Sequence, residues 1–157
     1  MGAGVTSQPV LRAQPIVRGA AEGIVLATTE PLSFWGGYDY RTGAIIDHRH
    51  PLVGQVAAGR VLVVPFTRGS STTTAVLLEA VRAGTAPAAI LTTGIDSFFA
   101  LAAIVAEVMY GRVLPVLALA GRDFATLRTG ERLRIEEDGT IWRTESDTDD
   151  TENTDRE

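Results

Sequence analysis

The sequence contains no cysteine and no lysine. Without cysteine, the chain has no disulfide, no thiolate nucleophile and no thiolate ligands for an iron-sulfur cluster. Without lysine, Schiff-base catalysis is excluded. His48 and His50 are its only two histidines, and a transition-metal site usually needs three or four ligands. We therefore expect no metal or other cofactor bound by this chain alone.

Long apolar runs and a basic excess are also missing. No apolar stretch reaches the roughly 20 residues that span a bilayer, and the N-terminal segment lacks the basic start and apolar centre of a secretory signal, so we expect a cytoplasmic protein with no membrane partner. The net charge of -5 arises in segment 145–157, which holds seven acidic residues and one Arg, and the rest of the chain is near +1. A nearly neutral body without basic clusters argues against nucleic-acid binding.

The length of 157 residues and the hydrophobic content of 45% indicate one domain with a substantial core. Residues 1–13 are rich in Gly, Ser and Pro, and we expect a flexible N-terminus there. The domain itself is assigned to residues 14–144. Residues 145–157 are expected to be a disordered acidic tail.

Strand and helix patterns alternate through the middle of the chain. The expected strands are 14–29 (one or two), 44–46, 60–65, 88–92, 113–119, 127–135 and 140–143, and the expected helices are 73–83 and 97–110. Such alternation indicates a small parallel sheet with helices, and the last two strands, around the turn 137–139, indicate a second, antiparallel sheet. The predicted fold class is α/β.

Polar groups concentrate where strand 60–65 gives way to helix 73–83. Arg68 and Gly69 are followed there by five consecutive hydroxyl residues, which include Ser70, Ser71 and Thr72. A glycine allows close approach of the backbone, and a guanidinium beside a helix N-terminus favours an anion. The hydroxyls also suit simple helix capping, and that alternative stays open. A Walker loop and a nucleophile elbow are excluded because their glycine spacings are missing.

Other polar and aromatic residues have ordinary structural interpretations. Gly36 and Gly37 either approach a substrate by their backbone or form a tight turn. Three loop residues, Asp39, Asp47 and His50, either serve as acid, base or ligand or bond nearby amides, and we favour the second interpretation. Asp96 is interpreted as the cap of helix 97–110. The aromatics Trp35, Tyr38 and Tyr40 are assigned to the core or to a partner interface.

Several motifs in one order resemble the small subunit, or swivel domain, of the aconitase X family. They are Pro31-Leu32-Ser33-Phe34-Trp35-Gly36-Gly37-Tyr38-Asp39, Thr42-Gly43, Ile46-Asp47, His50-Pro51-Leu52, Gly59-Arg60-Val61-Leu62-Val63, Arg68-Gly69-Ser70, Leu77-Leu78-Glu79, Gly84-Thr85-Ala86-Pro87 and Tyr110-Gly111. The resemblance runs from about Gly19 to Trp142.

This resemblance implies a swivelling β/β/α domain that pairs with a large aconitase-like subunit, which carries an iron-sulfur cluster or iron. Members of the family are dehydratases that act on small anionic hydroxy acids. In the family, the serine at the position of Ser70 is taken as the proton-abstracting base. The resemblance thus implies an iron-dependent hydro-lyase subunit that is inactive alone, with Arg68, Gly69, Ser71, Thr72, Gly36 and Gly37 as the substrate-binding candidates.

Two substrates are compatible with the resemblance. They are cis-3-hydroxy-L-proline and (R)-5-phosphomevalonate, and the Arg-rich, Lys-free composition favours the first. After Ser70 the chain departs from the family pattern at Thr73-Thr74-Ala75, which leaves a change of specificity open. The rival hypothesis is a non-catalytic swivel module that only binds an anion.

Overall fold

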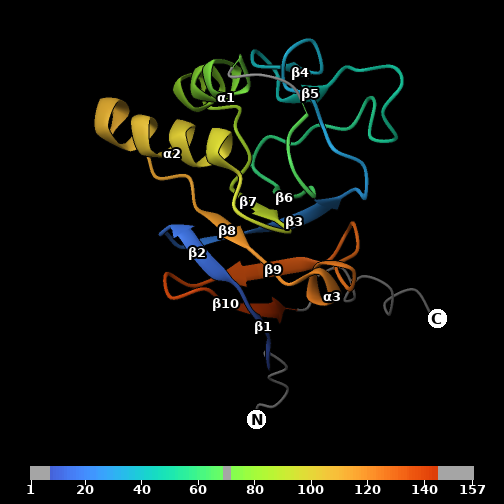
Figure 1. Cartoon of the computed structure of the whole chain (residues 1–157), viewed down its shortest axis with the longest axis vertical. Helices are drawn as coiled ribbons and strands as arrows, with labels where there is room; N and C mark the ends of the chain where they lie inside the picture. The colour runs from blue at the N-terminus through green and yellow to red at the C-terminus, as the bar shows by residue number, and fades with distance from the viewer. Residues whose placement is uncertain (1–7, 69–71, 145–157) are drawn as a thin grey trace, which may run out of the picture.

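The structure is a computed structural model that describes residues 8–68 and 72–144 (Figure 1). The candidate residues Gly69, Ser70 and Ser71 and the predicted acidic tail lie outside the described residues. The elements, in chain order, are β1 (Gln8–Arg12), β2 (Gln14–Val17), β3 (Ala21–Ala27), β4 (Tyr38–Asp39), β5 (Ala44–Ile45), β6 (Val61–Val63), α1 (Thr72–Ala83), β7 (Ala89–Thr92), α2 (Ser97–Tyr110), β8 (Val116–Ala118), α3 (Gly121–Phe124), β9 (Arg132–Ile135) and β10 (Thr140–Thr144).

Strand β3 joins a parallel and an antiparallel part of one sheet. The strand order within the described residues is β1-β10-β9-β3-β6-β7-β8-β2, and β4 pairs with β5 separately. On one side β3 runs antiparallel to β9, with Ala21 opposite Ile135. On its other side it runs parallel to β6, with Val25 opposite Val61. The predicted α/β class, with its parallel and antiparallel parts, is confirmed, and the two parts share a strand.

Both faces of the central strands are buried, so their sequences read as continuous apolar runs. Neighbouring residues of a strand point to opposite faces: Leu26 and Leu62 pack in the core under α1 and α2, whereas Val25 and Val61 pack in the core of the other face. Figure 1 shows α1 and α2 side by side on one side of the strands, with α3 beside β9 on the other. In the part of the chain that the structure describes, no helix is both long enough and apolar enough to cross a membrane.

The predicted elements agree with the structure best where local signals mark both ends. Helix α2 spans the predicted residues 97–110, with Asp96 as N-cap and Gly111 in the left-handed conformation at its end. Within the segment 1–13, which was predicted to be a flexible N-terminus, Gln8–Arg12 form β1 and pair with β10. Strand β1 depends on pairing with a segment at the far end of the sequence, which no local pattern indicates.

The turn between β9 and β10 packs closely against the connection from β1 to β2. The Ala13 N–H donates to the Gly139 carbonyl at 2.8 Å. A Cβ added to Gly139, whose φ is +95°, would lie 2.1 Å from the Ala13 carbonyl oxygen. Gly130 has a similar φ of +100°, with nothing within 4 Å of an added Cβ. Both glycines thus have a backbone conformation that would strain another residue, but only at Gly139 would an added Cβ also collide with neighbouring backbone atoms.

We predict that Gly130→Ala lowers the free energy of unfolding by about 1–2 kcal/mol, the cost of placing a side chain at positive φ. Gly139→Ala should cost about 2 kcal/mol more, because the added methyl group meets backbone atoms. Urea denaturation of both variants beside the unaltered chain measures the difference. Equal losses would mean that the Ala13 carbonyl moves aside easily.

Candidate functional site

Three loops meet at the edge of the sheet where β3, β6 and β7 end. These strands are parallel neighbours, so their carboxyl ends lie at the same edge, which is where open α/β sheets bind ligands. The first loop follows β3, the second follows β6 and the third follows β7. The Arg68 N–H donates to the Leu32 carbonyl at 3.1 Å, which joins the second loop to the first. The Thr93 N–H donates to the Pro65 carbonyl at 3.2 Å, which ties the third loop to the second.

A polar cavity of about 210 Å³ opens between the loops that follow β3 and β6 and the segment 47–50. Its lining residues are Glu30, Pro31, Ser33, Asp47, Arg49, His50 and Arg68. Two arginines and two carboxylates thus face one space, although they come from three separate segments of the chain. Arg49 has a side chain that is 92% exposed, with its Nε 3.8 Å from Asp47 Oδ1. The cavity therefore offers both signs of charge to a small ligand.

The predicted anion-binding turn begins at this cavity. Arg68 lines it and is exposed. Gly69, Ser70 and Ser71 follow outside the described residues, and α1 starts at Thr72. The structure therefore places Arg68 at the cavity, and Thr72 is not among the lining residues. The roles predicted for the three residues between them stay predictions.

Gly36 and Gly37 do not line the cavity, and the conformation of each explains its residue type. Gly36 is exposed with a φ of +77°, a left-handed conformation that favours glycine. Gly37 is buried, and a Cβ there would lie 2.1 Å from the Ser33 carbonyl oxygen. The tight-turn interpretation accounts for both glycines, and their contact with a substrate stays a prediction.

The interpretation of Asp39, Asp47 and His50 as loop-organising residues is confirmed. Each accepts a hydrogen bond from the amide two residues later: Asp39 Oδ1 from Arg41 at 2.9 Å, Asp47 Oδ1 from Arg49 at 3.0 Å, and His50 Nδ1 from Leu52 at 3.0 Å. The other ring nitrogen of His50 lies 3.4 Å from the Glu30 carbonyl oxygen. Both nitrogens of this buried imidazole thus face groups of the chain itself.

The described residues do not fit an iron site. Within residues 8–68 and 72–144, no three side chains of the His, Cys, Asp and Glu types lie together so that they could hold a metal ion. The complete sequence has no cysteine to ligate a cluster. The described lining of the cavity offers charged groups and hydrogen-bonding groups.

Asp96 has a second role that sequence reasoning missed. As predicted, its Oδ1 caps α2 by accepting from the amides of Phe98 at 3.1 Å and Phe99 at 3.2 Å. Its Oδ2 accepts from the Thr67 amide at 2.8 Å and from the Thr67 hydroxyl at 3.0 Å. The same buried carboxylate thus fixes both the start of α2 and the residue before Arg68. Only the capping role leaves a local signal in the sequence.

The aromatic residues of the first loop separate into core and surface. Tyr38 stacks on Phe34 with ring centroids 4.6 Å apart and donates to the Thr85 carbonyl at 2.9 Å. Burial raises the pKa of the Tyr38 phenol, so this group remains a hydrogen-bond donor. Tyr40 packs partly buried against the same core. Trp35, in contrast, is exposed on the loop after β3.

The threonines that depart from the family pattern pack α1 against the rest of the domain. Thr73 is 1% exposed, and its hydroxyl has no hydrogen-bond partner within the described residues. The Thr74 hydroxyl donates to the Phe98 carbonyl of α2 at 3.1 Å. Neither residue lines the cavity. In this chain the two threonines thus contact the interior and α2, and neither belongs to the described wall of the cavity.

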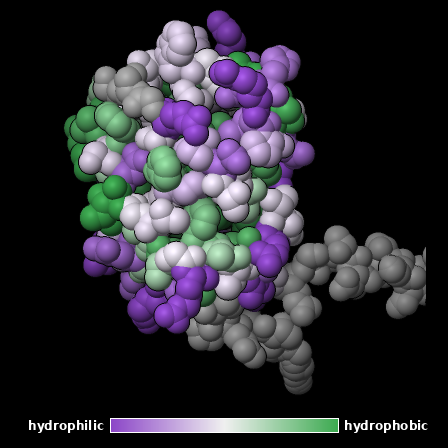
Figure 2. Space-filling model, turned by 45° about the vertical axis from the view of Figure 1, so that its right-hand side comes forward, coloured by the Kyte–Doolittle hydropathy of each residue, from purple (hydrophilic) through white to green (hydrophobic). Residues whose placement is uncertain are grey.

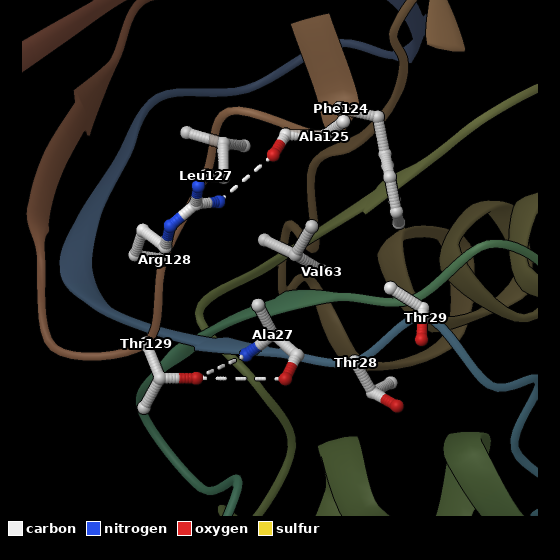
Figure 3. Close-up of a pocket in the computed structure, with 9 residues that line it drawn as sticks. All are labelled: Ala27, Thr28, Thr29, Val63, Phe124, Ala125, Leu127, Arg128 and Thr129. Atoms are coloured by element: carbon white, nitrogen blue, oxygen red, sulfur yellow. Dashed lines mark hydrogen bonds between the residues drawn. The ribbon is translucent and has the colours of Figure 1, made fainter. Parts of the chain in front are cut away.

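A second cavity of about 210 Å³ lies between the end of β3 and the segment that follows α3 (Figure 3). Its walls are largely apolar and include Val63 and Phe124. Its polar groups serve the chain itself: the Thr129 hydroxyl accepts from the Ala27 amide at 2.9 Å, and the Arg128 guanidinium donates to the Ala125 carbonyl at 2.9 Å. The polar cavity beside Arg68 is therefore the stronger candidate site.

Sequence reasoning missed Glu30 and Arg49 as cavity residues. Each is an ordinary exposed charge in an irregular segment, and no motif or period distinguishes it. Their common location arises from the folding of the long stretch between β3 and β6. A sequence signal exists only for Arg68, which stands next to a glycine and a run of hydroxyl residues.

Comparisons with known proteins agree on one family. The model of the aconitase X swivel domain matches residues 10–143. The cis-3-hydroxy-L-proline dehydratase of Pseudomonas aeruginosa is 49% identical over 107 residues, which are 68% of this chain and 18% of that protein. The phosphomevalonate dehydratase small subunit of Methanothermobacter thermautotrophicus is 43% identical over 93 residues, which are 59% of this chain and 71% of that subunit.

A solved structure has the same fold. The crystal structure of Thermococcus kodakaraensis aconitase X in its holo-form superposes with a TM-score of 0.78 at 31% sequence identity. The alignment covers 88% of this chain and all of the matched chain. The present chain nevertheless spans less than a fifth of the length of the cis-3-hydroxy-L-proline dehydratases that it matches.

We predict that Asp96→Asn lowers the free energy of unfolding by about 1–3 kcal/mol, because an amide has one acceptor oxygen and cannot serve both α2 and Thr67. Asp96→Ala should cost about 1 kcal/mol more, since the helix cap is also lost. Chemical denaturation measures both values. Asp123→Asn on α3, outside this junction, is the matched control and should stay within about 0.5 kcal/mol of the unaltered chain. An Asn variant as stable as the unaltered chain would refute the double role.

Proposed function

Because this chain belongs to the aconitase X swivel-domain family, we propose that it is the small subunit of an iron-dependent dehydratase, a hydro-lyase that acts on a small anionic hydroxy acid. The match to the family model over residues 10–143 confirms the family resemblance that was inferred from the sequence motifs. One observation carries the proposal: a small cavity lined by two arginines opens at the carboxyl edge of the parallel strands, and one of them, Arg68, stands two residues before Ser70 in the sequence. The chain is active only with a large aconitase X-type subunit.

In this proposal Ser70 removes a proton from a carbon of the substrate. A serine alkoxide is a poor resting species, so such a base requires positive charge and hydrogen-bond donors nearby. Arg68 supplies a guanidinium two residues before Ser70, and α1 begins two residues after it, so that its N-terminal end favours negative charge. Gly69, Ser71, Thr72, Gly36 and Gly37 are the proposed substrate-binding positions around it.

The iron-sulfur cluster or iron belongs to the large subunit in this proposal, because the described residues do not fit such a group. When bound, that group supplies a Lewis acid for the departing hydroxyl. The present chain contributes one wall of a shared site, and its residues hold the substrate and accept the proton.

The balance of charge in the cavity supports cis-3-hydroxy-L-proline as the substrate. Arg49 and Arg68 are accompanied by Glu30 and Asp47, so the lining carries no large positive excess. A zwitterion with one carboxylate and one ammonium group suits such a lining better than a phosphate ester that also carries a carboxylate. The higher identity to the Pseudomonas protein agrees with this choice. Phosphomevalonate is the alternative substrate, and an anion-binding module without catalysis is the alternative function.

We predict that the complex of this chain with a large aconitase X-type subunit, prepared without oxygen, consumes cis-3-hydroxy-L-proline and leaves 5-phosphomevalonate unchanged. Loss of each substrate is followed by chromatography in parallel reactions, with the separate subunits as controls. Turnover of phosphomevalonate instead would refute the substrate assignment but would agree with the proposed dehydratase function. A metal-loaded complex without turnover of either compound, or no complex at all, would refute the proposed function.

We predict that Ser70→Ala lowers kcat of the reconstituted complex by about 100-fold or more, because a general base is lost. Ser97→Ala is the matched control, since Ser97 is exposed at the start of α2 and does not line the cavity. It should keep kcat within about twofold, and both variants should bind the large subunit like the unaltered chain. A Ser70→Ala enzyme with kcat within a few fold of normal would contradict the assignment of the base.

A further inference from the structure

Asp47 is held in place by the fold more closely than the other charged residues that line the polar cavity. Its Oδ1 accepts from the Arg49 amide at 3.0 Å, which fixes the carboxylate in a turn. The preceding amide, that of Ile46, donates to the Gly37 carbonyl at 2.9 Å. The Asp47 carbonyl accepts from the His50 amide at 3.0 Å. The Asp47 side chain is 26% exposed, whereas the other three charged residues of the lining are fully on the surface.

The negative charge of Asp47 is compensated weakly by the chain itself. The Arg49 Nε lies 3.8 Å from Asp47 Oδ1, which is too long for a hydrogen bond, and water solvates this exposed guanidinium. No hydrogen bond from residues 8–68 or 72–144 reaches Asp47 Oδ2. A partly buried carboxylate with an unused oxygen is a strong acceptor for a cationic group.

The surroundings of Asp47 favour a small polar ligand. Asp47 stands two residues after β5, and Figure 2 shows strongly hydrophilic side chains around the top of the molecule, where β4 and β5 lie in Figure 1. The cavity of about 210 Å³ is also lined by Arg68, whose guanidinium suits a carboxylate. In an α-amino acid the carboxylate and the ammonium are attached to one carbon atom, so one small cavity can contact both groups.

We propose that Asp47 is the specificity-determining residue of the cavity and that its carboxylate binds the ammonium group of a cyclic amino acid, while Arg68 binds the carboxylate of the same molecule. This inference rests on the proposed function, because the substrate belongs to it. Asp47 needs no rearrangement to take this role, since its turn is formed without the ligand. Binding by a prearranged group loses little conformational entropy.

The assignment explains how the cavity distinguishes an amino acid from other anionic hydroxy acids. An acid of the same shape without the ammonium leaves the Asp47 carboxylate unpaired in a partly enclosed space, and this loss weakens binding. A phosphate ester brings further negative charge to the same carboxylate, which repels it. Selection therefore comes from attraction of the right ligand and repulsion of the wrong one.

The test compares Asp47→Asn with Asp39→Asn in the complex with the large subunit. Asn keeps an oxygen that accepts from the amide two residues later, so the turn is preserved while the charge is lost. Asp39 is the matched control, because it forms the same kind of turn with Arg41 at 2.9 Å and does not line the cavity. Circular dichroism verifies that both variants are folded.

Asp47→Asn should raise KM for cis-3-hydroxy-L-proline about 10–100-fold and keep kcat within about threefold, because the substrate and the transition state lose the same charged contact. Asp39→Asn should change neither constant by more than about twofold. An Asp47→Asn enzyme with an unaltered KM would overturn the inference.

Two unreactive ligands separate the effect of charge from that of shape. L-Proline has the ring, the carboxylate and the ammonium but no hydroxyl to lose, and cyclopentanecarboxylate lacks the ammonium as well. As competitive inhibitors of the Asp47→Asn enzyme, L-proline should bind about 10–100-fold more weakly than to the unaltered enzyme, and cyclopentanecarboxylate should stay within about threefold. Equal weakening of both ligands would mean that Asp47 shapes the cavity without binding the ammonium, which would overturn the inference.

The unaltered complex provides a check that does not depend on the folding of a variant. Calorimetric titration should show L-proline binding at least about 10-fold more tightly than cyclopentanecarboxylate, because one charged contact distinguishes them. Equal affinities would overturn the inference.

Failure of the inference and failure of the proposed function give different results. A complex that dehydrates cis-3-hydroxy-L-proline equally well after Asp47→Asn would overturn the inference and agree with the proposed function. Turnover of phosphomevalonate instead would overturn the inference together with the substrate assignment, and the chain would still be a dehydratase subunit. A complex without turnover of either compound, or no complex at all, would overturn the proposed function and the inference that rests on it.

Discussion

The parallel pairing of β3, β6 and β7 is the constraint on which the candidate site depends. Because these strands run in one direction, three connections leave the sheet at the same edge. Their backbone polar groups then satisfy one another, as in the bonds from Arg68 to Leu32 and from Thr93 to Pro65. The Asp96 carboxylate completes this arrangement by bonding both Thr67 and the start of α2. A slip of one strand would separate the loops and remove the cavity.

Much of the fold could be predicted from the sequence, because its signals are local. The apolar period of α2, with Asp96 before it and Gly111 after it, defines that helix within one segment of sequence. The turn at Gly139 similarly identifies the pair β9 and β10. Strand β1 could not be predicted, because its stability comes from β10 at the other end of the domain. No local sequence pattern indicates that β3 pairs parallel with β6 on one side and antiparallel with β9 on the other.

Only the part of the site that lies in one short segment of the sequence could be predicted. Arg68 beside a glycine and several hydroxyl residues is a recognisable pattern, and the structure places this guanidinium at the cavity. Glu30, Asp47 and Arg49 reach the same cavity through the folding of irregular segments, which no periodicity describes. The second role of Asp96 was missed for the same reason, since Thr67 lies 29 residues away in the sequence.

Strand β1 pairs with β10 so that Gln8 lies opposite Arg143, near the two ends of the domain. Figure 1 shows these strands at the far end of the molecule from β4 and β5. A covalent joint made at either end would thus attach at nearly the same point. Such a joint would attach at the end of the molecule opposite β4 and β5, so it would leave the β4–β5 end free of the joint.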